Sequence, residues 1–107
     1  MKIKLLILTA VLLTVLSVIF EDKTYKITAY CDQGLTKMGT PVRVGVCAVD
    51  PKVIPLGSIV EIKGIGRFRA EDTGSKVKGR VIDIYMPNCV EAKKFGVQWR
   101  KFEIERR

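Results

Sequence analysis

The stretch AEDTGSKVKGRVID, residues 70–83, is the most informative part of the chain. Asp72 lies at a Gly-rich bend, whereas Asp83 lies within an apolar strand predicted over residues 81–85. A single carboxylate between two isoleucines is costly to bury unless it faces a cleft or a partner. A carboxylic acid from which water is partly removed keeps its proton near neutral pH, because burial disfavours the charged form. Asp83 is therefore a candidate general acid.

Short strands are predicted on both sides of this stretch. Alternating or short apolar runs that end near Gly or Pro predict strands over residues 23–30, 44–49, 58–63, 67–71, 81–85 and 97–104. One helix is predicted after Asn88, which can cap it, with Glu91 closing a capping box and Gly96 ending it. We therefore expect a mainly β fold, a small barrel of about six strands whose closure removes exposed edges.

The N-terminal residues differ in composition from the rest. Residues 5–20 carry no charge and follow Lys2 and Lys4. This pattern predicts a signal peptide or a membrane anchor. A helix of this length spans about 24 Å, short of a bilayer core about 30 Å thick, yet no cleavage site of small residues precedes Glu21, so both alternatives stay open. We expect residues 1–22 to serve export to the cell envelope or outside, and residues 23–107 to form one domain.

The part of the chain after residue 20 is basic, with 17 Lys and Arg against 11 Asp and Glu. For an exported protein, this charge favours anionic wall polymers or phospholipid surfaces as partners. The basic residues are spread evenly, which together with export argues against nucleic acid.

Cysteine and histidine usage narrows the chemistry. Cys31, Cys47 and Cys89 could form one disulfide in an exported protein, but the sequence does not choose among the three pairings. The chain has no histidine and no Cys-x-x-Cys pair, so no metal site is expected. Without histidine, Ser-His-Asp and Cys-His catalytic triads and His-ligated zinc sites are excluded. Any acid–base chemistry must be carried by carboxylates.

Three aspartates stand at or within the predicted strands: Asp50, Asp72 and Asp83. Asp50 precedes Pro51 and is typical of a turn residue. Asp72 could likewise form an Asx turn with the Thr-Gly pair that follows it. Asp83 has no such simple structural explanation.

Six segments resemble a known family: TAY (28–30), GTPVR (39–43), AVDPKVIPLG (48–57), AEDTG (70–74), KGR (78–80) and IDIYMP (82–87). In this order, and over residues 27–104, they resemble the three-aspartate or 3D domain, a family similar to the catalytic domain of membrane-bound lytic transglycosylase A. The resemblance implies a double-psi β-barrel that cleaves the glycan strands of peptidoglycan. We expect it to act as a monomer.

The resemblance also implies a set of site residues. Asp83 would be the catalytic acid and base, with Asp72 and Asp50 lining the same pocket as supporting carboxylates. The residues expected to bind substrate or shape its groove are Tyr30, Thr40, Thr73, Gly74, Lys78 and Gly79.

A mechanism with one acid fits a chain without histidine. Protonated Asp83 would donate to the glycosidic oxygen between N-acetylmuramic acid and N-acetylglucosamine, while a neighbouring carboxylate stabilises the oxocarbenium-like centre. Ionised Asp83 would then accept the proton of the sugar's 6-hydroxyl, giving a 1,6-anhydro product. Neither a metal nor a cofactor is required.

Two other functions stay open. Ser75 and Lys76 replace the glycine and the small apolar residue usual in the family, and these changes favour a wall glycan-binding module without turnover. An endoglucanase-type or expansin-like activity is the third hypothesis, because related double-psi barrels act on plant glycans.

Overall fold

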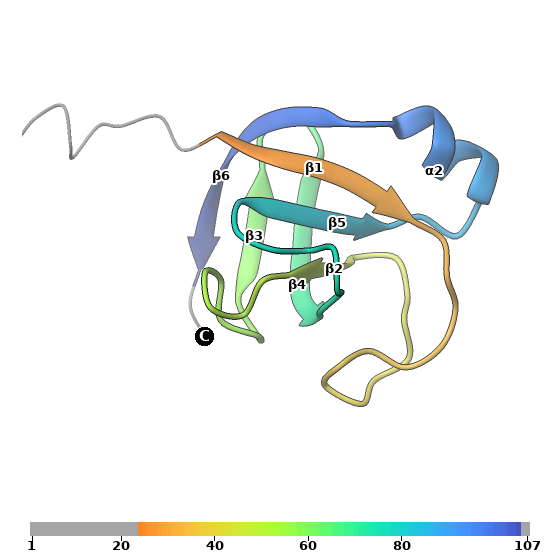
Figure 1. The fold of residues 1–107 in the computed structure, drawn as a ribbon, viewed down its shortest axis with the longest axis horizontal. Coiled ribbons are helices and arrows are strands. Elements are labelled where there is room, and N and C mark those ends of the chain that lie inside the picture. The colour runs from red at the N-terminus through yellow and green to blue at the C-terminus, as the bar shows by residue number, and fades with distance from the viewer. Residues whose placement is uncertain (1–23, 106–107) are drawn as a thin grey trace, which may run out of the picture.

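The computed structural model describes residues 24–105, which form six strands and one helix (Figure 1). In chain order the elements are β1 (Thr24–Tyr30), β2 (Val46–Val49), β3 (Ile59–Ile62), β4 (Gly66–Asp72), β5 (Val81–Tyr85), α2 (Cys89–Phe95) and β6 (Gln98–Glu105). The predicted signal peptide or anchor over residues 1–22 lies outside the described residues, so this division of the chain stays a prediction. Within residues 24–105, no helix has the length and apolar character needed to cross a membrane.

The strands close into a barrel in the order β1-β5-β2-β4-β3-β6. Two pairs are parallel, β1 with β5 and β2 with β4, and the other neighbours are antiparallel. If β1 is exchanged with β4, β2 with β5 and β3 with β6, the same closed strand order results, read in the opposite sense around the barrel. The two halves of the chain are therefore related by a pseudo-twofold axis between β2 and β5. This is the predicted double-psi β-barrel with a single short helix.

Alternate residues of each strand point inward and form one core. Ile27, Val49 and Ile82 are fully buried there. The ring of Tyr25 in β1 meets Phe102 of β6 edge to face, with 4.3 Å between the ring centroids. The intervening residues face outward, and the outer side of β1, β5, β2 and β4 carries the site described below.

The element boundaries agree with the predicted ones within two residues. Strand β2 begins later than expected because Gly45 adopts a φ of +97° and Val44 before it is 73% exposed. The predicted helix cap is confirmed, since Asn88 Oδ1 accepts hydrogen bonds from the Val90 N–H (2.9 Å) and the Glu91 N–H (3.1 Å). Gly96 ends the helix with a φ of +62°.

Candidate functional site

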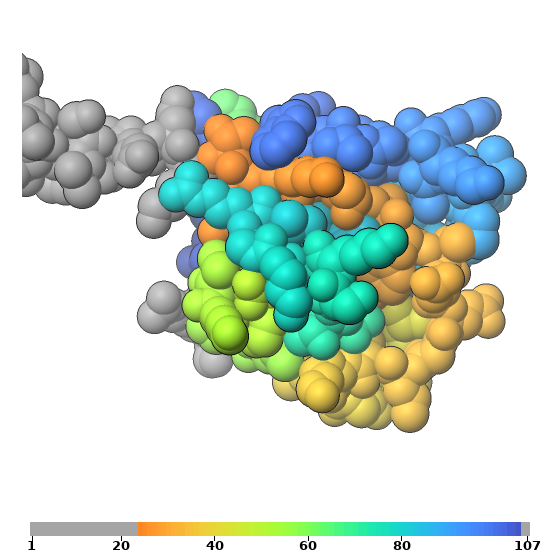
Figure 2. All heavy atoms as spheres, viewed as in Figure 1, coloured from red at the N-terminus to blue at the C-terminus, as the bar shows by residue number. Residues whose placement is uncertain are grey.

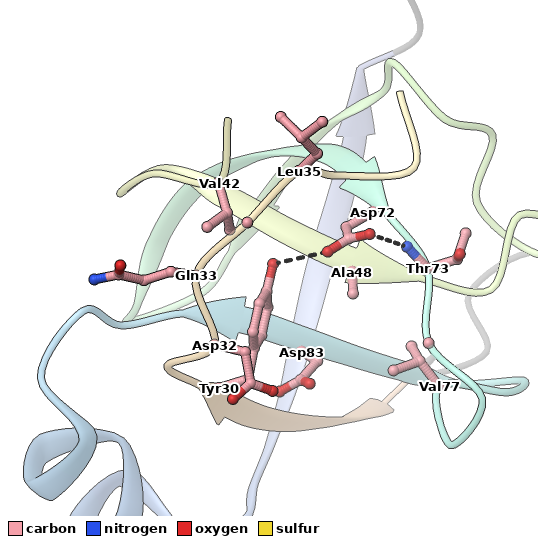
Figure 3. Close-up of a pocket in the computed structure, with 12 residues that line it drawn as sticks. Tyr30, Asp32, Gln33, Leu35, Val42, Ala48, Asp72, Thr73, Val77 and Asp83 are labelled. Carbon is pink, nitrogen blue, oxygen red and sulfur yellow. Dashed lines mark hydrogen bonds between the residues drawn. The ribbon is translucent and has the colours of Figure 1, made fainter. Parts of the chain in front are cut away.

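Four strands place four side chains in one row on the outer face of the barrel. Thr28 of β1 pairs in register with Asp83 of β5, and Asp83 pairs with Ala48 of β2. Ala48 pairs in turn with Asp72 of β4. The small side chain of Ala48 leaves space between the two carboxylates, and a cleft of about 250 Å³ lies over the row (Figure 3). The cleft is lined by Tyr30, Asp32, Gln33, Gly34, Leu35, Val42, Ala48, Asp72, Thr73, Gly74, Val77 and Asp83.

A register shift in β4 brings Asp72 to the cleft. Cys47 pairs with Ala70, but the next residue of β2, Ala48, pairs with Asp72, so Glu71 is an extra residue in β4. By strict alternation Asp72 would share the inward face of Ala70, which belongs to the core. The bulge turns Asp72 outward, consistent with the general use of bulges to redirect side chains near functional sites.

Asp83 is a half-buried carboxyl in the cleft. The Thr28 hydroxyl donates a hydrogen bond of 2.8 Å to Asp83 Oδ1, and within residues 24–105 no group bonds Asp83 Oδ2. Burial raises the pKa of Asp83; the bond from Thr28 opposes this, and the negative charges of Asp32 and then Asp72 add to it. Asp83 therefore combines an available oxygen with an increased tendency to hold a proton.

Asp72 is fixed by three donors. Its Oδ1 accepts from the backbone N–H groups of Lys37 (3.1 Å) and Thr73 (2.9 Å), and its Oδ2 accepts from the Tyr30 hydroxyl at 3.3 Å. Figure 3 shows the Tyr30 side chain reaching across the cleft to Asp72, with Asp32 beside Asp83. Burial and the charge of Asp72 raise the pKa of Tyr30, so its hydroxyl stays protonated and acts as a donor. Bonds of this kind suit Asp72 to the role of a stationary negative charge.

One wall of the cleft comes from the loop over residues 31–45, which is held at both ends. A disulfide joins Cys31 to Cys89 at the start of α2. Near the other end, Arg43 donates two hydrogen bonds, of 2.7 and 3.1 Å, to the carboxylate of Glu71 in β4. This loop carries Asp32 and Leu35 into the cleft lining.

Glu71 is the centre of the second attachment. Its side chain is fully buried, and besides Arg43 it pairs with Arg69 (3.3 Å) and accepts a hydrogen bond from the Thr40 hydroxyl (3.1 Å). These partners keep the pKa of Glu71 below its ordinary value, chiefly through the bonds from Arg43. Glu71, the extra residue of the β4 bulge, is thus an ionised side chain that holds the loop forming the cleft wall through Arg43.

The sequence matches the family model of the 3D domain over residues 45–105. The chain belongs to the 3D domain family.

Three proteins of Bacillus subtilis are similar to this chain. "Cell wall-binding protein YocH" is 49% identical over 53 residues, 50% of this chain and 18% of that protein. "Putative cell wall shaping protein YabE" is 48% identical over 59 residues, 55% of this chain and 14% of that protein. "SPbeta prophage-derived uncharacterized protein YorM" is 40% identical over 82 residues, 64% of this chain and 34% of that protein. The chain thus spans about a third or less of the length of these relatives.

This 3D domain brings several of the predicted site residues together. Asp83 and Asp72 line the cleft with Tyr30, Thr73 and Gly74. Thr40 lies outside the lining, where it binds Glu71 and exchanges a hydrogen bond of 2.7 Å with the hydroxyl of Thr36.

Asp50 was expected in the same pocket, but the structure places it outside the cleft lining. Its Oδ2 accepts the N–H of Gly79 (2.8 Å) and its Oδ1 the N–H of Lys52 (3.1 Å). These bonds, with smaller contributions from Lys78 and Lys52, lower the pKa of Asp50. Asp50 therefore orients the loop that ends at Gly79. Lys78 and Gly79, which were also expected to bind substrate, lie outside the cleft lining as well.

Sequence reasoning missed Asp32 and Glu71. Asp32 follows a cysteine in a polar loop, and nothing local distinguishes it; a known Cys31–Cys89 pairing would have placed it near β5. Glu71 stands beside Asp72 in the AEDTG segment, and its burial depends on arginines distant in the chain.

The third cysteine, Cys47, lies outside the disulfide. Cys47 is a buried free thiol whose pKa burial raises to about 12, so it stays protonated and unreactive. No group of three metal-ligating side chains occurs within residues 24–105.

Proposed function

We propose that this 3D domain binds glycan strands of cell-wall peptidoglycan in the cleft. The names of two similar proteins refer to wall binding and wall shaping, and they support a location at the wall. The lining supports a sugar ligand, because it offers carboxylates, hydroxyls and an amide beside the apolar side chains of Leu35, Val42 and Val77. The excess of basic residues favours association with a wall that carries anionic polymers.

We further propose that the domain cleaves the strand as a lytic transglycosylase. One observation carries this step: Asp83 is a half-buried carboxyl in the cleft, with an available oxygen and a raised pKa. A general acid at neutral pH needs these properties.

The chemistry follows from the positions of the carboxyls. Asp83 donates its proton to the oxygen between the two sugars, so the bond from that oxygen to C1 of N-acetylmuramic acid breaks and N-acetylglucosamine leaves with a free hydroxyl. The negative charge of Asp72 stabilises the positive charge that develops at C1. Asp83, now a carboxylate, accepts the proton of the 6-hydroxyl as that oxygen closes on C1. The product is the 1,6-anhydro sugar, and Asp83 is again protonated.

A binding module without turnover is the second candidate function. The relative whose name states cell wall binding favours it, and so do the exposed Ser75 and Lys76 beside Gly74 of the cleft lining. Both candidates use the same cleft and differ only in whether Asp83 transfers a proton.

Digestion of purified sacculi distinguishes the two candidates. The protein is incubated with sacculi, and mass spectrometry identifies the soluble muropeptides. We expect 1,6-anhydro products, and a decrease of at least about a hundredfold in their release for Asp83→Asn, in line with the usual contribution of general acid–base catalysis. Glu61→Gln, the same change at an exposed carboxylate of β3, is the matched control.

Other outcomes have defined meanings. Products with reducing muramic ends would make the protein a hydrolase and would refute the anhydro mechanism. Co-sedimentation with sacculi that is equal for the wild type and Asp83→Asn, without soluble products, would establish the binding module. Neither binding nor cleavage would exclude both candidates.

A further inference from the structure

Trp99 is an exposed aromatic side chain on the outer face of the barrel. It is the single tryptophan of the chain, and 60% of it is exposed. Strand β6 alternates strictly: Phe102 and Ile104 pack against the core, whereas Trp99 and Lys101 face outward. Trp99 is therefore not needed to fill the core.

The strand register places Trp99 beside the row that forms the cleft. Trp99 pairs with Lys26 of β1, and Lys26 pairs with Val81 of β5. Two residues further along the same strands, Thr28 pairs with Asp83. With strands about 4.8 Å apart and a rise of about 3.3 Å per residue, the Cα atoms of Trp99 and Asp83 lie roughly 12 Å apart along the outer face. Figure 2 shows residues of β6 (blue), β1 (orange) and β5 (teal) adjacent on this face.

The cleft is small for a polymer. Its volume of about 250 Å³ falls below the usual range of about 300–1,000 Å³ for small-molecule sites. A glycan strand with a sugar at Asp83 must therefore leave the cleft and continue over the surface. The face that bears Lys26 and Trp99 adjoins the cleft on the β1 side.

We propose that Trp99 and Lys26 form a second subsite for the same glycan strand, an inference that rests on the proposed glycan binding. The face of an indole ring is negative, so it attracts the C–H groups on the apolar face of a pyranose and also removes them from water. Lys26 forms no ion pair with any residue in the 24–105 range and is the cross-strand partner of Trp99. Its ammonium group suits the lactyl carboxylate of N-acetylmuramic acid or a carboxylate of the stem peptide. The pair thus recognises a sugar that carries an acid.

The single tryptophan provides a direct test. Fluorescence of the full-length chain carrying Asp83→Asn, which prevents turnover, is titrated with a muropeptide disaccharide and with glycan fragments of six or more sugars. We expect the long fragments to change the emission of Trp99 and to protect it from acrylamide, and the disaccharide to do neither. In calorimetry, Trp99→Ala should weaken binding of long fragments about tenfold, as loss of an anchoring aromatic residue commonly does. Its effect on the disaccharide should be less than twofold.

Matched variants separate the contributions. Trp99→Phe should recover most of the affinity for long fragments. Lys26→Gln should weaken their binding severalfold, whereas Lys63→Gln, at an exposed lysine after β3, should not. Unchanged thermal unfolding of Trp99→Ala would establish that its loss of affinity is not a loss of fold.

Two results would overturn the inference and leave the proposed function intact: equal affinity of Trp99→Ala and the parent chain for long fragments, or equal effects of the substitution on long and short ones. An emission shift with phosphatidylglycerol vesicles but none with glycan would assign the ring to a membrane surface and also overturn it. Failure of the parent chain to bind any glycan would refute the proposed function itself.

Discussion

Asp83 and Asp50 show opposite uses of the same side chain. Burial and nearby negative charge raise the pKa of Asp83, whereas backbone N–H donors lower the pKa of Asp50. An acid with a raised pKa in the folded state destabilises the fold progressively as pH rises from its ordinary pKa to the raised one, and fully above that. An acid with a lowered pKa stabilises the fold above its ordinary pKa, and this contribution is lost as pH falls. In the proposed mechanism Asp83 therefore serves chemistry at the expense of stability, whereas Asp50 serves stability.

We predict that Asp83→Asn stabilises the domain at neutral pH by about 1 kcal/mol, within the range typical of single stabilising substitutions. The amide has no proton to lose, so it avoids both the cost of a desolvated negative charge and the cost of keeping the acid protonated above its ordinary pKa. It can still accept the bond from Thr28. The difference should disappear below the ordinary Asp pKa of about 3.9, where both side chains are neutral. Thermal unfolding from pH 3 to pH 8 measures it. Asp50→Asn should instead lower the stability of the domain at neutral pH. Stabilisation by both variants would contradict this interpretation.

Asp32 should extend the upper pH limit of the proposed reaction. Burial is the main cause of the raised pKa of Asp83, and the charge of Asp32 raises it further, so Asp32→Asn favours the ionised, inactive form of the acid. We expect the alkaline limb of the profile of anhydromuropeptide release against pH to move to lower pH, with a smaller effect on the rate below that limb. Asp32→Glu, which keeps the charge, serves as the control. A uniform decrease at every pH would instead assign Asp32 to substrate binding.

At the scale of elements, the disulfide between Cys31 and Cys89 joins the cleft loop to α2 across 58 residues of sequence. A covalent link over such a loop stabilises mainly by restricting the unfolded chain. We predict that Cys31→Ser with Cys89→Ser lowers the free energy of unfolding by about 2–4 kcal/mol. Urea denaturation with and without dithiothreitol measures the difference, and the reductant should have no effect on the double variant. Equal stability of the oxidised and reduced wild type would refute the prediction.

The elements themselves were largely predictable, because their signals are local. Strand β5 was placed at its observed bounds from its apolar run, and Asn88 and Gly96 marked the ends of α2. The bulge in β4 was not predictable, since it follows from the pairing of β4 with a distant strand. Asp50 was assigned to the pocket by the family resemblance, although its position before Pro51 is typical of a turn residue. Its partner Gly79 lies 29 residues away, and only the folded chain shows that Asp50 binds this loop.

At the scale of the whole molecule, positive charge should promote wall binding. Seventeen basic residues against eleven acidic ones follow residue 20, and several bind no carboxylate within the structure's 24–105 range, among them Lys52, Lys76 and Lys78. Salt screens such attraction over about 10 Å at 0.1 M ionic strength. We predict that co-sedimentation of Asp83→Asn protein with sacculi decreases severalfold between 50 and 500 mM salt. Replacing Lys76 and Lys78 by Gln should reduce this dependence, and salt-independent binding would contradict a role for charge.

The barrel as a whole was predictable in class, whereas its site was predictable only in part. Six short strands and one helix suffice to indicate a closed barrel, and the family motifs supplied the double-psi order. The cleft also needs the loop over residues 31–45, whose position depends on Arg43 meeting Glu71. Contacts between such distant residues leave no periodic signal in the sequence.

The pseudo-twofold axis has a consequence for the proposed binding of a glycan in the cleft. The axis relates Asp83 to Ala48, and Thr28 to Asp72, so the strand order at the site is the same from either direction, apart from the bulge at Glu71. A sugar chain looks different from its two directions, because its reducing and non-reducing ends differ. Chain direction must therefore be read from the features that the axis does not repeat. These include an acid and a hydroxyl on one side of the axis, and a methyl group and a fixed anion on the other. Exchanging the acid and the methyl group, Asp83→Ala with Ala48→Asp, would place the proposed proton donor on the opposite side of the sugar linkage.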